Sequence, residues 1–285
     1  MKALFGPAGN SESFAANGHK KTIEVPAFVN EFGLTAYEYQ CGHGVRVSDQ
    51  SAAEFGAEAR KYQLSLSVHA PYYISLSGID PETRNKSIEY ILQTARAAKA
   101  MGATRFVVHS GSAGKISREE AMALAKDTLT RAWEAMKEEH LDDIILCPET
   151  MGKFNQLGNL QEVMELCKIT EQFLPCIDFG HLNARTLGSL RTSADYEQIL
   201  DTIENELGAA RLKVFHSHFS QIEYTEKGGE KRHLTFEDEI YGPFFEPLAD
   251  LIAKKGLTPT FICESAGTQA EDAQRMQQIY FNCLK

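Results

Sequence analysis

The sequence predicts an α/β fold, a single (β/α)8 barrel, on three observations. Eight short apolar or β-branched runs alternate with longer segments of helical period, which is the pattern of βα units around a parallel sheet. The chain has 285 residues, a length that suits one barrel of about 250 residues. No low-complexity linker divides it. An open doubly wound sheet would usually have about five or six strands, so we expect residues 1–285 to form one barrel domain.

The eight predicted strands follow one another along the whole chain. They cover residues 3–6, 36–39, 64–69, 105–109, 144–148, 174–178, 212–216 and 260–264. Helix starts between them carry capping chemistry, since Asp80 followed by Pro81 fits an N-cap and a first helical position. Capping-box spacing is present in three pairs: Ser51 with Glu54, Ser117 with Glu120 and Thr268 with Glu271. Left-handed C-terminal caps are expected at four glycines: Gly33, Gly102, Gly208 and Gly256.

One long polar segment interrupts this alternation. Residues 224–239 follow the seventh predicted strand and contain a run of charged residues and glycines. Long connections in compact domains often carry function. We therefore expect this insertion to form a loop over the mouth of the barrel.

Composition limits the classes of protein. Lys and Arg total 29 against 39 Asp and Glu, a formal net charge of -10 that argues against coating nucleic acid by charge alone. No run approaches the roughly 20 apolar residues of a membrane helix, and no signal peptide is recognisable. The six cysteines include no C-x-x-C pair and predict buried, reduced thiols. We expect a cytoplasmic monomer that does not bind membranes.

The predicted strands end in residues that bind metals. In a barrel these ends converge on one mouth, where active sites lie. The residues at or just beyond the ends are His69, His109, Glu149, Asp178, His181, His216, His218 and Glu264, with His233 in the insertion above them. Imidazoles mixed with carboxylates and no thiolate suit zinc, manganese or iron(II). The set exceeds the needs of one ion, so we expect two or three ions sharing a carboxylate, an arrangement that usually activates water and clamps phosphate oxygens.

Several motifs resemble those of endonuclease IV. They are the runs SVHAPYY at 67–73, VVHSGS at 107–112, PET at 148–150 and IDFGH at 177–181, together with His216 and Glu264. That family consists of DNA repair enzymes that act at abasic sites and are built on a (β/α)8 barrel with three zinc ions. The resemblance implies a zinc-dependent hydrolase that binds double-stranded DNA and cleaves the phosphodiester 5′ to an abasic site.

The resemblance also implies roles for individual residues. His69, His109 and Glu149 would hold one ion, and Glu149 would bridge to a second. The second ion would be completed by Asp178, His216 and Glu264. We expect Glu149 and Glu264 to be the catalytic carboxylates. Tyr72 and Arg46 match positions that push side chains into DNA at the lesion, although a mouth-lining aromatic and a solvated charge are the plainer interpretations.

A third ion in the family is held by a histidine and an Asp-x-His pair. Here the histidine would be His181 and the pair reads Lys231-Arg232-His233, so a lysine stands where the aspartate is expected. Glu230 is one position away and would need a register shift to replace it. Alternatively, the ammonium of Lys231 would neutralise a substrate phosphate in place of the third ion.

Two other interpretations stay open. A xylose-isomerase-like sugar isomerase or epimerase would use one divalent ion, held by Glu149, Asp178, His216 and Glu264, with Glu149 and Glu264 moving a proton. It would leave His69, His109 and His181 without a metal role. A non-catalytic metal-binding relative is the third interpretation.

Overall fold

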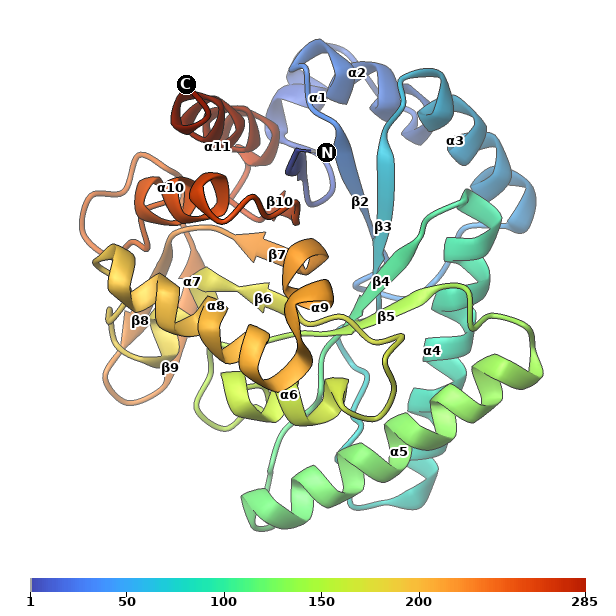
Figure 1. The fold of residues 1–285 in the computed structure, drawn as a ribbon. Coiled ribbons are helices and arrows are strands. Elements are labelled where there is room, and N and C mark those ends of the chain that lie inside the picture. The colour runs from blue at the N-terminus through green and yellow to red at the C-terminus, as the bar shows by residue number, and fades with distance from the viewer. Residues whose placement is uncertain (1) are drawn as a thin grey trace.

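Eight parallel strands close into a barrel in the computed structural model, which describes residues 2–285 (Figure 1). The strands are β1 (Leu4–Pro7), β2 (Ala36–Gln40), β3 (Ser65–His69), β4 (Arg105–Val108), β5 (Ile145–Pro148), β6 (Cys176–Asp178), β7 (His216–Phe219) and β10 (Thr260–Cys263). They form two four-stranded sheets, β1-β10-β7-β6 and β2-β3-β4-β5. Parallel bridges join the sheets at both seams, between Ala8 and Glu38 and between Glu149 and Cys176. The predicted barrel is confirmed.

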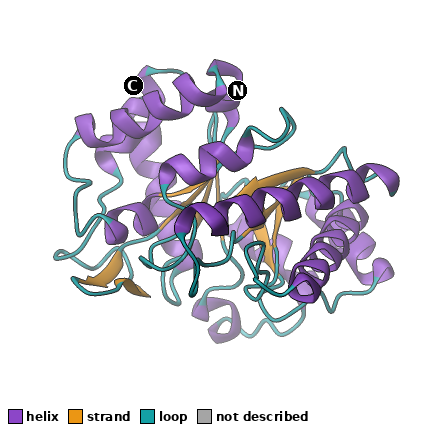
Figure 2. Ribbon diagram, turned by 90° about the horizontal axis from the view of Figure 1, so that it is seen from below, coloured by secondary structure: helices purple, strands orange, loops and turns teal. Residues whose placement is uncertain are grey.

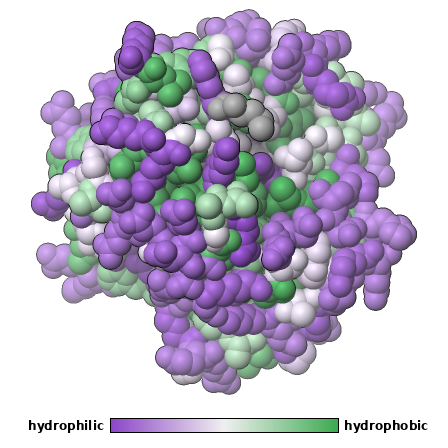
Figure 3. Space-filling model, viewed as in Figure 1, coloured by the Kyte–Doolittle hydropathy of each residue, from purple (hydrophilic) through white to green (hydrophobic). Residues whose placement is uncertain are grey.

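Helices surround the strands and pack their apolar faces inward (Figure 1). They are α1 (Glu12–Ala16), α2 (Val25–Glu31), α3 (Asp49–Lys61), α4 (Pro81–Met101), α5 (Arg118–Glu138), α6 (Leu160–Cys167), α7 (Phe179–Arg185), α8 (Ser193–Leu207), α9 (Ala209–Val214), α10 (Glu246–Lys254) and α11 (Gln269–Cys283), with a 3-10 turn η1 (Thr22–Glu24). The face in Figure 3 is largely hydrophilic, with smaller apolar areas between the polar side chains.

The helix ends test the capping predictions. The Asp80 carboxylate accepts hydrogen bonds from the first turn of α4, and Gly102 ends that helix in the left-handed conformation, both as predicted. Ser117 caps α5, but Ser51 lies inside α3, where its backbone N–H donates to the Ser48 hydroxyl. Gly208 has φ +88° and ψ 157°, so it joins α8 to α9 without a left-handed cap.

The predicted seventh strand is wrong in its position. Residues 212–214 belong to α9, a short helix that follows Gly208, and β7 begins only at His216. The run from Leu212 is apolar enough to suggest a strand. In the structure its first residues are helical, and the chain enters the barrel only at His216. His216 therefore starts the strand. His218 is two residues nearer the carboxyl end, on the same face of the strand.

The polar insertion also differs from the prediction. Instead of an irregular loop it forms an antiparallel hairpin of β8 (Ile222–Thr225) and β9 (Gly229–His233). Figure 2 shows this hairpin at the edge of the molecule, apart from the barrel strands. One residue of β9 is unpaired, since Tyr224 faces Glu230 while Glu223 faces Arg232. This β-bulge changes which side chains face the barrel mouth.

The core lies mainly between strands and helices. One large cluster fills this layer, with the stacked rings of Phe5 and Phe261 (centroids 5.4 Å apart) near its centre. Inside the barrel the apolar residues form only two small clusters, one around Val107 and one around Ile262. The barrel interior is thus left to polar groups.

Two further sequence predictions concern cysteines and membranes. All six cysteines are free, and five are buried; Cys283 is partly exposed. None of the helices described within residues 2–285 is long and apolar enough to cross a membrane.

Gly6 tests the closure of the barrel between β1 and β2. A Cβ atom at this position would lie 1.8 Å from the carbonyl oxygen of Ala36, a backbone atom that cannot swing aside. We expect Gly6→Ala to lower the free energy of unfolding by about 3 kcal/mol, the upper range for overpacking. Gly228→Ala, whose Cβ would meet only the Thr225 hydroxyl at 3.4 Å, is the control and should change it by less than about 0.5 kcal/mol. Urea unfolding measures both; equal stabilities would contradict the close approach.

Candidate metal centre

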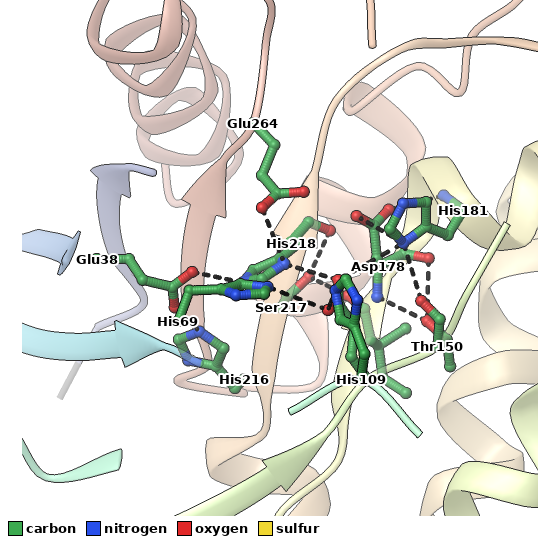
Figure 4. Close-up of polar contacts among 12 residues, drawn as sticks. Glu38, His69, His109, Thr150, Asp178, His181, His216, Ser217, His218 and Glu264 are labelled. Carbon is green, nitrogen blue, oxygen red and sulfur yellow. Dashed lines mark hydrogen bonds and ion pairs between the residues drawn. The ribbon is translucent and has the colours of Figure 1, made fainter. Parts of the chain in front are cut away.

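Histidine and carboxylate side chains from adjacent strand ends meet at one mouth of the barrel (Figure 4). Glu149 lies at their centre, just beyond β5, and is fully buried. Its Oε2 is 3.0 Å from Nε2 of His109 and 3.5 Å from Nε2 of His69, while its Oε1 is 2.9 Å from Nδ1 of His218. The two carboxylate oxygens therefore face different histidines, as a carboxylate that bridges two ions requires.

A second group of ligand atoms adjoins the first. Glu149, Asp178, His218 and Glu264 offer ligand atoms that all lie within 4.8 Å of one another. Asp178 ends β6 and caps α7, where its Oδ1 accepts a hydrogen bond from the backbone of His181 at 2.7 Å. Its Oδ2 is 3.2 Å from Nδ1 of His181 and has no aligned hydrogen-bond donor among residues 2–285.

The hairpin supplies the third group. Ligand atoms of His181, Glu230 and His233 lie within 4.8 Å of one another, and Oε2 of Glu230 is 3.5 Å from Nε2 of His181. The bulge explains the three-residue spacing: without it Glu230 and His233 would point to opposite faces of β9. Gly152 leaves room for this approach, because a Cβ there would lie 2.6 Å from Cβ of Glu230. The β-bulge in β9 is thus the register shift that Glu230 needs in order to replace the expected aspartate.

The same bulge turns Lys231 away from the mouth. Lys231 and Arg232 both form ion pairs with Glu223 on the outer face of the hairpin, and the Lys231 side chain is 53% exposed. The geometry thus contradicts the hypothesis that the Lys231 ammonium replaces a third ion. A carboxylate, Glu230, stands at that place instead.

His216 does not reach the ligand groups around Glu149. It is buried at the start of β7, and its Nε2 is 2.9 Å from Glu38 in β2 rather than near Glu149 or Asp178. His218 takes the place that the resemblance assigned to His216. The assignment of His216 came from the resemblance of motifs, and the H-x-H spacing was the signal available: both histidines face inward, and only the second is near the mouth.

Backbone and hydroxyl partners orient three of the imidazoles. Nδ1 of His69 lies 2.8 Å from the Ala70 carbonyl, and Nδ1 of His181 lies 2.9 Å from the Thr150 carbonyl. A carbonyl only accepts, so Nδ1 carries the proton and Nε2 keeps its lone pair. This arrangement is typical of metal-binding histidines. Nδ1 of His233 is likewise 2.8 Å from the Ser220 hydroxyl.

The buried oxygens fit a divalent cation. Oε2 of Glu149 and Oδ2 of Asp178 are inaccessible to water and find no aligned hydrogen-bond donor among residues 2–285. Burial works to raise the pKa of Glu149, but the histidines around it, His218 first, hold that pKa well below its usual value. Burial raises the pKa of Asp178 to about 6 against the opposing effect of His181. Unpaired buried carboxylate oxygens are unfavourable unless a cation is bound, so the residues present fit the expected metal centre.

Three neighbouring cavities lie at the mouth, and one of them is lined by the candidate metal ligands. A cavity of about 760 Å³ is lined by His69, His109, His181, His233 and Glu264. Tyr72 lines this cavity and both of its neighbours, of about 730 and 320 Å³. Tyr72 is 50% exposed, and its ring centroid is 5.1 Å from that of His69. Arg46 is exposed and lines the cavity on the side of α3.

The fold and the site define a (β/α)8 barrel with candidate metal ligands at its mouth. Residues 26–280 match the family model described as xylose isomerase-like TIM barrel, and the chain belongs to that family. It is 33% identical over 267 residues to "Uncharacterized protein MJ0133" of Methanocaldococcus jannaschii, covering 92% of this chain and 91% of the relative. It is 29% identical over 199 residues to a "Probable endonuclease 4" of Thermoplasma acidophilum, covering 67% of each.

Two solved structures share the fold. Endonuclease IV from Thermus thermophilus superposes with a TM-score of 0.69 at 18% identity, covering 99% of this chain and 98% of that one. A D-tagatose 3-epimerase-like protein superposes with a TM-score of 0.71 at 17% identity, covering 90% of this chain and 92% of that one. The resemblance to endonuclease IV is confirmed, and the fold is shared with sugar epimerases.

The hairpin offers a matched pair of variants for the third group of ligands. We expect Glu230→Gln to weaken binding of one ion by at least about 100-fold, because an anionic oxygen is lost from that group. Lys231→Gln alters the neighbouring residue, which faces outward, and should retain every ion. Metal counting by mass spectrometry after dialysis against a weak chelator measures both. Equal metal content in the two variants would show that Glu230 holds no ion.

Binding of metal should depend on pH through Asp178. With a pKa of about 6 in the metal-free protein, this carboxyl is protonated below pH 6, and an ion must displace the proton. We therefore expect metal affinity to fall by about tenfold per pH unit as the pH drops from 6 to 5, with little change from this group above pH 7. Calorimetric titration at several pH values, in buffers of different ionisation enthalpy, would count the protons released. No proton release near pH 5.5 would contradict the assignment.

Proposed function

We propose that the protein is a metal-dependent endonuclease that hydrolyses the phosphodiester 5′ to an abasic site in double-stranded DNA, as in base excision repair. The observation that carries this proposal is the number of ligand groups. A single-ion sugar epimerase would use Glu149, Asp178, His218 and Glu264 alone. The chain adds His69 and His109 on one side and a separate group of His181, Glu230 and His233 on the other.

The proposed cofactor is Zn2+, with Mn2+ or Fe2+ as alternatives, in two or three sites. Such ions lower the pKa of coordinated water and neutralise phosphate oxygens. The chain would hold them through His69, His109 and Glu149, through Glu149, Asp178, His218 and Glu264, and through His181, Glu230 and His233. Glu149 faces histidines of the first two groups with different oxygens, so it is the residue that would serve both ions.

The protein's own residues then position the reaction. Glu264 lines the cavity and keeps 15% of its side chain exposed, so it can accept the proton of the attacking water. The new bond forms to phosphorus, and the bond from phosphorus to the leaving 3′-oxygen breaks, with a proton returned to that oxygen. Glu149 keeps the ligand groups together during this exchange.

The shape of the mouth favours an extended substrate. Its three cavities share Tyr72, so a strand can run across the metal-binding groups and past an exposed aromatic ring on which an unpaired base or sugar can stack. Three basic residues line it: Lys21, Arg46 and Lys153. None of them forms an ion pair with any residue in the described range 2–285, which leaves them for phosphates.

Lys153 is held on a rigid loop beside the ligand groups. The Arg185 guanidinium donates to the carbonyls of Met151 and Lys153 at 2.9 and 2.8 Å. Arg118 donates to the carbonyl of Gln156 at 2.7 Å from the other side. These charge-assisted hydrogen bonds fix the backbone that carries Lys153, so its ammonium is presented to the mouth.

Sugar epimerisation is the second candidate. It is supported by the complete four-residue group around His218 and by the shared fold with the D-tagatose 3-epimerase-like protein. In that reaction Glu149 and Glu264 would exchange a proton with a sugar carbon. His69, His109 and the third group would then have no direct role.

A duplex with one abasic analogue distinguishes the two functions. We expect the protein loaded with zinc, manganese or iron(II) to incise it 5′ to the lesion as a monomer, and to leave ketoses unchanged. His109→Ala should lower incision by at least about 100-fold, because it removes an imidazole next to the bridging carboxylate. An epimerase would tolerate this change.

The control is His140→Ala, which alters a histidine outside the mouth. Gel electrophoresis of the duplex and chromatography of a ketose panel measure the two activities. Epimerisation without incision would refute the endonuclease, and the absence of both activities in metal-loaded protein would favour a non-catalytic relative.

A further inference from the structure

A fully buried carboxylate, Glu38 in β2, lies one layer below the metal-binding groups. Figure 4 shows Glu38 to the left of His218, with Glu264 above it. Oε1 of Glu38 is 3.0 Å from Nε2 of His218, and its Oε2 is 2.9 Å from Nε2 of His216. The Ser67 hydroxyl donates to Oε2 at 2.9 Å. None of the roles described so far uses this charge.

Glu38 has no lysine or arginine partner among the residues described. Its ionic contacts are the two imidazoles alone. Burial of a carboxylate is unfavourable unless hydrogen-bond donors surround it. Burial works to raise the pKa of Glu38, but His218 and His216 hold that pKa well below its usual value. The barrel interior thus keeps an anion at a place where an apolar side chain would be expected.

The two ring nitrogens of His218 face different layers. Nδ1 points to the mouth, 2.9 Å from Glu149 and 3.4 Å from Glu264, while Nε2 points down to Glu38. A neutral imidazole has one N–H and one lone pair. In the structure Nδ1 is hydrogen-bonded to Glu149 at 2.9 Å, and Nε2 lies 3.0 Å from Glu38 without an aligned hydrogen bond. When the lone pair of Nδ1 is given to an ion, the N–H is on Nε2, beside Glu38.

We propose that Glu38 is a positioning residue for the metal centre: it fixes the ring orientation and tautomer of His218 so that Nδ1 is presented to an ion. Carboxylates that accept the second N–H of a ligating histidine raise its basicity and metal affinity. His216 belongs to the same support, because its own N–H donates to the other oxygen of Glu38.

A buried ion beside Glu38, below the mouth, is disfavoured by the state of the available ligands. Cys176, His216 and His218 do offer ligand atoms within 4.8 Å of one another. However, Nε2 of His216 is already hydrogen-bonded to Glu38 at 2.9 Å. Burial also raises the pKa of the Cys176 thiol well above its usual value, which disfavours the thiolate.

The proposal rests on the metal centre of the proposed function and not on its substrate. Glu38→Gln keeps the volume of the side chain but loses its charge and one acceptor oxygen. We expect the affinity for the ion at His218 to fall by about 10- to 100-fold, the range for such supporting groups. The ion held by His181, Glu230 and His233 should stay, and this selectivity separates a positioning effect from general destabilisation.

Chelator competition monitored by metal counting measures these affinities in the full chain loaded with zinc. Ser67→Ala, which removes a neighbouring donor but neither imidazole contact, should keep the wild-type affinity. Leu129→Ala, which opens a cavity in the buried face of α5, controls for lost stability without contact to the site. Nitrogen-15 chemical shifts of His218 should show a protonated Nε2 and a metal-bound Nδ1 in the wild type, and a changed Nε2 shift in Glu38→Gln.

Wild-type affinity in Glu38→Gln, or an equal loss of every ion, would overturn the positioning role. Loss of one ion in Cys176→Ala would also overturn it, because the lower layer would then hold an ion. A wild-type chain that binds no divalent ion would refute the metal centre, and with it the proposed function. Failure to incise DNA by a protein whose metal affinity responds as expected would refute only the proposed substrate.

Discussion

The burial of Glu149 constrains the whole mouth of the barrel. This carboxylate is inaccessible to water, and the histidines around it, His218 first, hold its pKa well below the usual value against the effect of burial. His69, His109 and His218 come from three different strands, so their approach to one charge fixes the relative positions of those strand ends. Neutral imidazoles alone offset little of the desolvation of a carboxylate. The full set of contacts is therefore explained best by cations between the ligands.

The rest of the fold supplies the stability that this polar interior cannot. The two apolar clusters inside the barrel are small, and the large cluster lies between strands and helices. The aromatic rings of Phe5, Phe245 and Phe261 pack against one another there, with Phe245 and Phe261 centroids 5.1 Å apart. A barrel built in this way can keep a layer of polar groups, Glu38 and His216 among them, beneath its mouth. The residues that stabilise the fold thus lie between the strands and the helices, and the candidate metal ligands lie at the mouth of the barrel.

The sequence predicted the fold well because the barrel repeats one local pattern. Strand position was recoverable wherever a β-branched or apolar run stood alone, as at 105–109, and failed where a short helix had the same composition, as at 212–214. The choice between His216 and His218 as the ligand depended on the structure, since the two share a face and differ only in depth. Glu38 was not recoverable, because a single carboxylate in an apolar strand has no local signature; its role depends on contacts with residues about 180 positions away, as for His216.

The hairpin shows how one inserted residue can preserve a site while the sequence around it changes. A strand without a bulge brings every second residue to one face, so an Asp-x-His pair needs no irregularity. In this chain the carboxylate and the histidine are three residues apart, and the bulge at Lys231 restores their common face. The same bulge allows Lys231 and Arg232, which point outward, both to form ion pairs with Glu223. A comparison of motifs position by position would find a lysine and infer a lost ligand, whereas the backbone brings Glu230 to the same place.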